Sequence, residues 1–507
     1  MTTEKTQVQK IFNTESTMKN HKYWLLVLVL SALSSSVLLI ASMHEAKWLT
    51  ATVLGLGMIY TCLILQRKLW HLLIFSAVFF IPLRIDFYLF FKPAYIVQSY
   101  GLPVSAFDLL LFVLVFYWVF KILTHKEKFN FYPSVSIPAL IYILLSGLSA
   151  LQSADRLNSF LVFVFMVKLY VVFIYFANKI KTQKEMLYVI FALISCVLFQ
   201  SLVGGIQYVT GSLLGIFGEP TTAFKTTLTG LESLSRVGGT IGHPNGLAKY
   251  LNLCLPVLLC VIFIRFNTVV RLLACLSFIL GGFTEILTFS RGGWLALGIV
   301  LILTFYEITR YRLKSRPISI IFATLLFLFL FGITMVVSDN FRNRLFKDDF
   351  GSAKSRIPMA QVALSIIKDK PLRGVGLNNY ATVMHAYDRT RNAQTYKFPH
   401  PVHNSYLLIA AESGIPALAA FLWLIAAIFN KARTTLKFNA SSFSLLQVGW
   451  IGGLMTWLIS GMFDRDFAGT NVMLWFTFAM VMASDRILFI ENKKEIGYET
   501  KGFSHRT

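Results

Sequence analysis

Long apolar runs separated by short polar gaps fill most of this 507-residue chain. A helix that crosses about 30 Å of hydrocarbon needs about 20 apolar residues, and fourteen windows approach that length. They lie near residues 24–43, 48–65, 69–83, 106–123, 135–151, 159–178, 186–208, 245–264, 268–289, 292–309, 318–337, 403–429, 443–462 and 468–488. The pattern predicts an all-α polytopic membrane protein with about 12–14 transmembrane helices and one long, partly helical outer loop.

Lysine and arginine side chains gather in every second gap between these runs. If the N-terminus is cytoplasmic, the basic gaps at 67–68, 121–128, 179–184, 265–271 and 310–316 all fall inside, as the positive-inside rule requires. The formal net charge of +23 therefore indicates membrane topology, and we expect no nucleic-acid partner. The five cysteines lie within apolar runs, where they are typical of small core residues.

This topology divides the chain into five parts. We expect a cytoplasmic N-terminal tail at 1–22 and an uncleaved first helix that acts as an anchor, because its apolar stretch is too long for a signal-peptide core. Helices 1–11 occupy 23–337, a large periplasmic or extracellular loop occupies 338–402, helices 12–14 occupy 403–490, and a cytoplasmic tail occupies 491–507. In the loop, apolar residues at helical spacing from Ser355 to Asp369 predict an amphipathic helix that ends before Pro371.

The outer loop carries eleven Lys or Arg residues against five Asp and no Glu. Long loops can cross a membrane regardless of charge, so the excess is compatible with an ordinary loop. It also suits a surface that binds an anionic group such as a diphosphate, for which arginine offers a planar fork of donors.

Three short strings at the outer ends of spans contain candidate functional residues. The first runs from Ser235 to Asn245, and the second is Thr288-Phe289-Ser290-Arg291-Gly292-Gly293. The third runs from Pro399 to Tyr406 and continues to Glu412, Gly414 and Pro416, where the helix should break. Each string could be purely structural: a turn entering a helix, an anchor at a membrane edge, or a capped break.

In combination these strings resemble the O-antigen ligase and O-antigen polymerase family of bacterial membrane glycosyltransferases. The family-like region covers about 230–430 and includes a Ser-Arg-Gly turn, a Pro-x-x-Gly-x-Gly-x-Asn string that begins at Pro371, and a His-Asn-x-Tyr string that begins at His403. The resemblance implies a GT-C-like helical fold in the bacterial inner (plasma) membrane. It also implies an active site that faces the periplasm or exterior, and a glycan donor linked to undecaprenyl diphosphate.

The resemblance also implies which residues act. The family's essential residues fall on Arg291, Arg356 and His403, where the two arginines would hold the diphosphate and His403 would activate the acceptor hydroxyl for inverting transfer. We expect a further set of residues to bind substrate: Arg236, His243, Asn245, Asn404, Tyr406 and Glu412. No cofactor or metal is expected, although Asp464-Arg465-Asp466 is formally an Asp-x-Asp string.

Several interpretations stay open. The acceptor is a second lipid-linked glycan in a polymerase and a lipid-core sugar in a ligase, and the long outer segments slightly favour a polymerase. A lipid-linked oligosaccharide flippase or transporter would place polar groups near the membrane midplane, where Lys168 is expected. A non-catalytic scaffold would tolerate changes at all three candidate catalytic residues.

Overall fold

The computed structural model describes eleven parts of the chain: 69–83, 86–90, 101–216, 219, 224–226, 234–312, 339–346, 355–391, 393–438, 442–465 and 471–503. The chain divides into two compact units, Met1–Ile74 and Phe75–Thr507, and the fold described below is that of the second unit. The predicted spans at 24–43, 48–65 and 318–337, the predicted N-terminal tail at 1–22, and residues 504–507 of the predicted C-terminal tail (491–507) lie outside the described residues.

Helices dominate the described residues, which confirms the predicted all-α polytopic membrane fold. The helices are α3 (Leu69–Phe80), α4 (Ala106–Leu123), α5 (Pro133–Ser149), α6 (Arg156–Lys179), α7 (Gln183–Thr210), α8 (Pro244–Phe263), α9 (Thr268–Leu287), α10 (Arg291–Arg312), α12 (Asp339–Phe346), α13 (Arg356–Asp369), α14 (Tyr380–Val383), α15 (Gln394–Lys397), α16 (Ser405–Ser413), α17 (Ile415–Phe438), α18 (Leu445–Ser460) and α19 (Val472–Phe503). Among the described residues, ten helices are long and apolar enough to cross a membrane.

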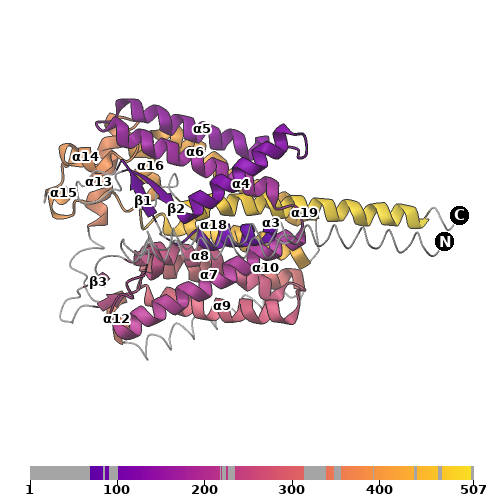
Figure 1. The fold of residues 1–507 in the computed structure, drawn as a ribbon. Coiled ribbons are helices and arrows are strands. Elements are labelled where there is room, and N and C mark those ends of the chain that lie inside the picture. Colours follow the sequence, from indigo (N-terminus) through magenta and orange to yellow (C-terminus); the bar gives the residue numbers. More distant parts are fainter. Residues whose placement is uncertain are drawn as a thin grey trace, which may run out of the picture. The chain divides into compact units, whose positions relative to one another are not determined.

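The short elements gather at one end of the long helices of the second unit. Figure 1 shows α13, α14 and α15 beside one another there, together with α12 and β3 (Phe224–Thr226). β3 pairs with β4 (Leu234–Arg236), and β1 (Asp86–Leu89) pairs with β2 (Leu102–Ser105), both antiparallel. We call this end of the second unit the loop end. Helix α6 also begins at the loop end, since Ser153, just before this helix, packs on Gly376 of the outer loop.

Helix α8 lies in the middle of the core and packs closely on α18. Three glycines on α18 permit this contact: a Cβ on Gly453 would collide with the carbonyl of Leu253, and one on Gly449 would lie 2.8 Å from the Cα of Val257. Gly452 makes a similar approach to Pro256. Small residues at helix interfaces let membrane helices approach closely. The contact fixes the first turn of α8 against the last turn of α18, and both carry polar residues at the loop end.

The predicted span at 403–429 is two helices instead of one. Helix α16 ends at Ser413 and α17 begins at Ile415, and Gly414 between them has a φ of +89°. That conformation is available to glycine without strain and breaks the helical ladder. The first span of this region therefore begins at Ile415, and α16 belongs to the loop end.

Lys168, expected near a midplane, forms an ion pair with Asp108 at 3.0 Å between Nζ and Oδ1. Asp108 also caps the start of α4, where it accepts from the backbone N–H of Ser105. A charged group in hydrocarbon is costly unless it is paired, so this pair fastens α4 to the middle of α6.

Candidate active site at the loop end

A cavity of about 250 Å³ opens between the ends of α8, α10, α13, α16 and α18. Its charged and titratable lining consists of Arg236, His243, Lys249, Arg291, Arg344, Arg356, His400, His403, Asp464 and Arg465. Six of these side chains are cationic and one is a carboxylate, so among the described lining residues positive charge strongly exceeds negative charge. Such an excess favours an anionic ligand.

The Ser-Arg-Gly turn forms one wall of the cavity. Arg291 is the first residue of α10, and the preceding carbonyls of Thr288 and Phe289 accept from Arg236 Nε at 2.9 Å and from Arg344 Nε at 3.2 Å. Arg236 also donates to Asn245 Oδ1 at 2.7 Å. The turn therefore gathers three guanidiniums from distant parts of the sequence.

Burial and the neighbouring positive charges both act on Arg236. Burial, followed by the charges of Arg344 and Arg291, lowers its pKa to about 10, and the charge of Asp464 opposes this shift. Guanidiniums that repel one another in a partly buried site gain energy when an anion enters. The planar donors of arginine suit a phosphate in particular.

His403 also lines the cavity and lies just before α16. Its Nδ1 lies 3.2 Å from the carbonyl oxygen of Pro401. A carbonyl can only accept, so this contact selects the tautomer that carries its proton on Nδ1 and leaves the Nε2 lone pair available. Burial, together with the charges of Arg465 and Arg356, lowers the pKa of His403 to about 4, and the charge of Asp464 opposes this shift. At neutral pH the ring is therefore an unprotonated base.

Asp464 is held between α8 and the end of α18. Lys249 Nζ lies 3.1 Å from Asp464 Oδ2 and donates at 2.7 Å to the carbonyl of Arg465, 216 residues away in the sequence. The other oxygen, Oδ1, accepts from the Arg465 N–H at 2.8 Å. Burial would raise the pKa of Asp464, but Lys249 and His403 outweigh it and keep the pKa below its usual value. Asp464 is thus the anion beside His403.

Asn404 and Tyr406 do not line the cavity and instead fasten α16 to α18. The side chain of Asn404 caps α16 by accepting from the N–H groups of Tyr406 and Leu407, both at 3.0 Å, and its amide donates to the carbonyl of Met462. The hydroxyl of Tyr406 donates to the carbonyl of Leu458 at 2.7 Å. These bonds fix where His403 lies relative to Asp464.

Glu412 also lies outside the cavity lining. Its buried carboxylate accepts from the N–H groups of Asn378 at 3.0 Å and Tyr380 at 3.1 Å. The glycines of the Pro-x-x-Gly-x-Gly-x-Asn string make room for this arrangement, because a Cβ on Gly374 would collide with the backbone of Glu412. The Pro-x-x-Gly-x-Gly-x-Asn string and Glu412 therefore connect the outer loop to the helix break between α16 and α17.

Six of the nine predicted site residues meet in the cavity: Arg236, His243, Asn245, Arg291, Arg356 and His403. Sequence reasoning did not assign site roles to Lys249, Arg344, His400, Asp464 or Arg465, which also line it. The signal for Lys249 and Asp464 was their position, since both are ionisable residues at span ends. Within the part of the chain that the structure describes, no group of three His, Cys, Asp or Glu side chains could hold a metal ion.

Part of the chain matches a known family. Residues 276–422 match the model of the O-antigen ligase family. The match confirms the resemblance to the O-antigen ligase and polymerase family, and it includes Arg291, Arg356 and His403. It supports glycan transfer of the ligase and polymerase type by a multi-pass bacterial membrane protein, with lipid-linked glycans as substrates. No curated protein matches the chain.

Proposed function

We propose that this protein transfers or polymerises glycan from an undecaprenyl diphosphate-linked donor at the outer face of the bacterial inner membrane. The observation that carries the proposal is the cavity that brings Arg291, Arg356 and His403 together with an excess of positive charge. The acceptor is a second lipid-linked glycan in a polymerase, and a lipid-core sugar in a ligase. The basic loops at the opposite end of the helices support an outward-facing cavity, since Lys and Arg mark the cytoplasmic side.

In the proposed reaction the acceptor hydroxyl oxygen attacks the anomeric carbon of the donor sugar. The bond from that carbon to the diphosphate oxygen breaks, and undecaprenyl diphosphate leaves with the electron pair. Arg291 and Arg356 stabilise the charge that grows on the leaving oxygen. Attack from the face opposite the leaving group inverts the anomeric configuration.

His403 receives the proton in this scheme. Its neutral ring presents Nε2 as the base, and the carboxylate of Asp464 stabilises the imidazolium that forms. The guanidiniums supply the positive charge that a divalent metal provides in many enzymes that act on phosphates. We therefore propose a metal-independent transfer. Arg236, His243 and Asn245 would contact the donor, because they lie in the same wall as Arg291.

Glycan profiling of a deletion strain tests the proposal. The strain is complemented with wild type or with Arg291→Ala, Arg356→Ala or His403→Ala, and Arg433→Ala on the exposed surface of α17 is the matched control. We expect the three cavity variants to reach the membrane, to lose long-chain or lipid-attached glycan, and to accumulate undecaprenyl-linked units on the outer leaflet. The control should retain wild-type glycan.

Two results would contradict the proposal. Wild-type glycan from all three cavity variants would remove the catalytic assignment. Accumulation of lipid-linked units on the inner leaflet of the deletion strain would indicate a flippase, because the units would then fail to cross the membrane.

A further inference from the structure

A compact cluster of hydrogen bonds lies in the outer loop between Asp388 and Lys397. The two carboxylate oxygens of Asp388 accept from the backbone N–H and hydroxyl groups of Thr390 and Thr395, and the four bonds are 2.5–2.9 Å long. The N–H of Gln394 donates back to Thr390 Oγ1 at 3.0 Å. Burial would raise the pKa of Asp388, but these bonds hold it at about 2. This cluster of hydrogen bonds therefore stays intact across the ordinary pH range.

The cluster holds an exposed aromatic platform, which consists of the rings of Tyr396 and His385. Tyr396 is 71% exposed, and its ring packs on the ring of His385 with centroids 4.4 Å apart. A hydrogen bond fixes the ring of His385, because Thr395 Oγ1 lies 2.9 Å from His385 Nδ1. A large ring fixed in place yet open to solvent has already lost the conformational freedom that ligand binding would cost. The polarised C–H groups on the face of a sugar ring suit the electron-rich face of a tyrosine.

Three cationic residues lie close to Tyr396 in the sequence. Arg389, Arg391 and Lys397 belong to the same segment of the outer loop, and all three are exposed. Residues 389–403 contain no Asp or Glu, and the carboxylate of Asp388 is engaged by Thr390 and Thr395. The carboxylate of Asp369 lies close enough to Arg389 that the hydrogen bond of Tyr387 and, less strongly, the charge of Arg389 lower its pKa. An aromatic platform flanked by cations suits an acidic sugar better than a neutral one.

The platform lies within reach of the cavity. Only three residues lie between Tyr396 and His400, which lines the cavity, so their Cα atoms are at most about 14 Å apart, a span on the order of two or three sugar rings. Figure 1 shows α15, which contains Tyr396, at the loop end beside α13 and α14. A glycan whose terminal sugar reacts in the cavity could therefore extend over Tyr396.

We propose that Tyr396, with His385, Arg389, Arg391 and Lys397, forms a subsite for acidic glycan, such as a chain that contains uronic acid or phosphorylated sugars. The subsite is separate from the cavity and holds a part of the chain remote from the reacting bond. Its role in catalysis rests on the proposed function, since it would retain the substrate or the growing product. The binding of glycan to this subsite does not depend on the proposed function.

Binding of defined oligosaccharides to the full chain in nanodiscs tests the subsite. The probes are an oligogalacturonate and a neutral malto-oligosaccharide of equal length, measured by calorimetry at two salt concentrations. Wild type should bind the acidic probe more tightly, and added salt should weaken that binding. Tyr396→Ala should weaken it by about tenfold, whereas Tyr396→Phe should bind like wild type because the ring face remains.

Matched charge variants complete the test. The triple change of Arg389, Arg391 and Lys397 to Ala should remove the preference for the acidic probe. The triple change of Lys126, Lys128 and Lys184 to Ala alters net charge equally, far from the loop end, and should leave binding unchanged. Binding that is unaffected by Tyr396→Ala, equal affinity for both probes, or no binding by wild type would each overturn the proposal.

The same assay separates this subsite from the proposed reaction. Arg291→Ala should bind the acidic probe like wild type while it loses transfer. If Arg291→Ala retained transfer but Tyr396→Ala lost binding, the proposed function would fail and the subsite would stand.

Discussion

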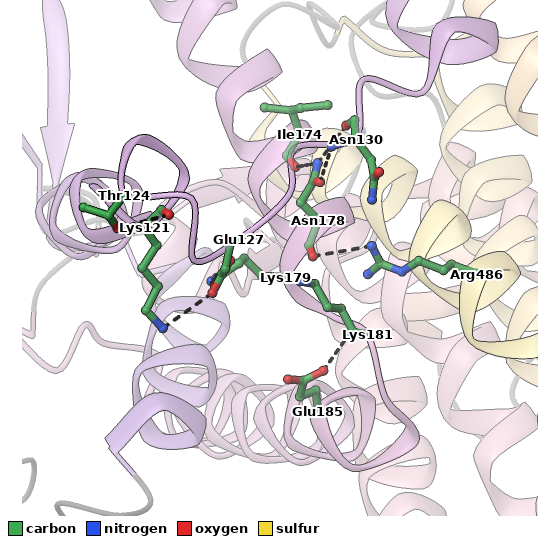
Figure 2. Close-up of polar contacts among 10 residues, drawn as sticks. All are labelled: Lys121, Thr124, Glu127, Asn130, Ile174, Asn178, Lys179, Lys181, Glu185 and Arg486. Atoms are coloured by element: carbon green, nitrogen blue, oxygen red, sulfur yellow. Dashed lines mark hydrogen bonds and ion pairs between the residues drawn. The ribbon is translucent and has the colours of Figure 1, made fainter. Parts of the chain in front are cut away.

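The two ends of the helix bundle use charged residues in opposite ways. At the end away from the loop end, Lys179 lies 2.7 Å from Glu127 and is almost fully buried, and Lys121 contacts the same carboxylate at 3.5 Å (Figure 2). Arg486 on α19 donates to the hydroxyl of Tyr132 at 2.9 Å and to the carbonyls of Asn178 and Ile180. These contacts join the α4–α5 connection, the end of α6 and α19.

The loop end gathers six cations around a cavity with one carboxylate among its described lining residues. Clustering like charges destabilises a folded chain, whereas pairing them with acceptors joins its helices. The difference indicates that the charged residues at the far end stabilise helix packing, whereas those at the loop end favour the binding of an anion. Variants at the two ends should therefore change different properties.

Removing a cation from the cavity should have the largest effect on transfer. Replacement of Arg291 by Ala is expected to lower kcat/KM by about 10²–10³-fold, because a charge that stabilises the leaving diphosphate is lost. Arg291→Lys should recover only part of this loss, since an ammonium cannot form the planar fork. The measurement is transfer with purified lipid-linked donor in nanodiscs. Retention of more than a third of wild-type activity by Arg291→Ala would contradict a charge role.

His403 should control the acid limb of the pH profile. Its pKa of about 4 means that the base is neutral at pH 7 and becomes protonated only near pH 4, so kcat/KM should fall at a pH well below the ordinary histidine value of about 6.5. Asp464 raises this pKa, and Arg465 lowers it. Asp464→Asn should therefore move the limb to lower pH and Arg465→Ala to higher pH.

These opposite shifts provide their own control. Both variants alter the same region, so general damage would lower activity without moving the two limbs apart. Shifts in one direction for both variants would show that His403 is not the titrating base. His403→Ala should lower activity by about 100-fold and abolish the limb.

Lys249 should act through Asp464. The change Lys249→Met removes the cation 3.1 Å from Asp464 and the donor to the Arg465 carbonyl. We expect kcat to fall by about tenfold with little change in KM, because the variant disturbs the partner of His403 and leaves the arginine wall intact. The comparison is Lys126→Met, which alters an exposed lysine near the far end. A rise in KM with unchanged kcat would place Lys249 in substrate binding instead.

The sequence predicted this fold and much of this cavity for one physical reason. Apolar runs long enough to cross a membrane are unmistakable, and ionisable residues at their ends are costly unless they act. Arg291 and His403 were found in that way, whereas Arg356 in the outer loop was implied only by the family resemblance, which also implied the roles of all three. The last predicted span, near 468–488, corresponds to the candidate span Val472–Ile490, and helix α19 continues beyond that span to Phe503.

What the sequence could not predict depends on contacts between distant segments. The pairing of Lys249 with Asp464 requires α8 and α18 to pack through glycines, and no local pattern encodes their register. Glu412 was predicted to bind substrate, and its position at the expected helix break also suggested that it could orient His403 or an arginine, or cap the break. In the structure its carboxylate is consumed by the N–H groups of Asn378 and Tyr380, a tertiary contact that helix periodicity cannot reveal.

The smallest effect is expected at the far end, where Glu127→Gln should lower stability by about 1–2 kcal/mol and leave transfer unchanged. Burial would raise the pKa of Glu127, but the hydrogen bond and charge of Lys179 outweigh it and hold the pKa below its ordinary value. The carboxylate therefore stabilises the fold above pH about 4.5, and this contribution is lost as the pH falls. Thermal unfolding at pH 7 and pH 4 should show a gap between wild type and variant that narrows at pH 4. A loss of transfer in the folded variant would mean that the far end takes part in the reaction, and the contrast between the two ends would fail.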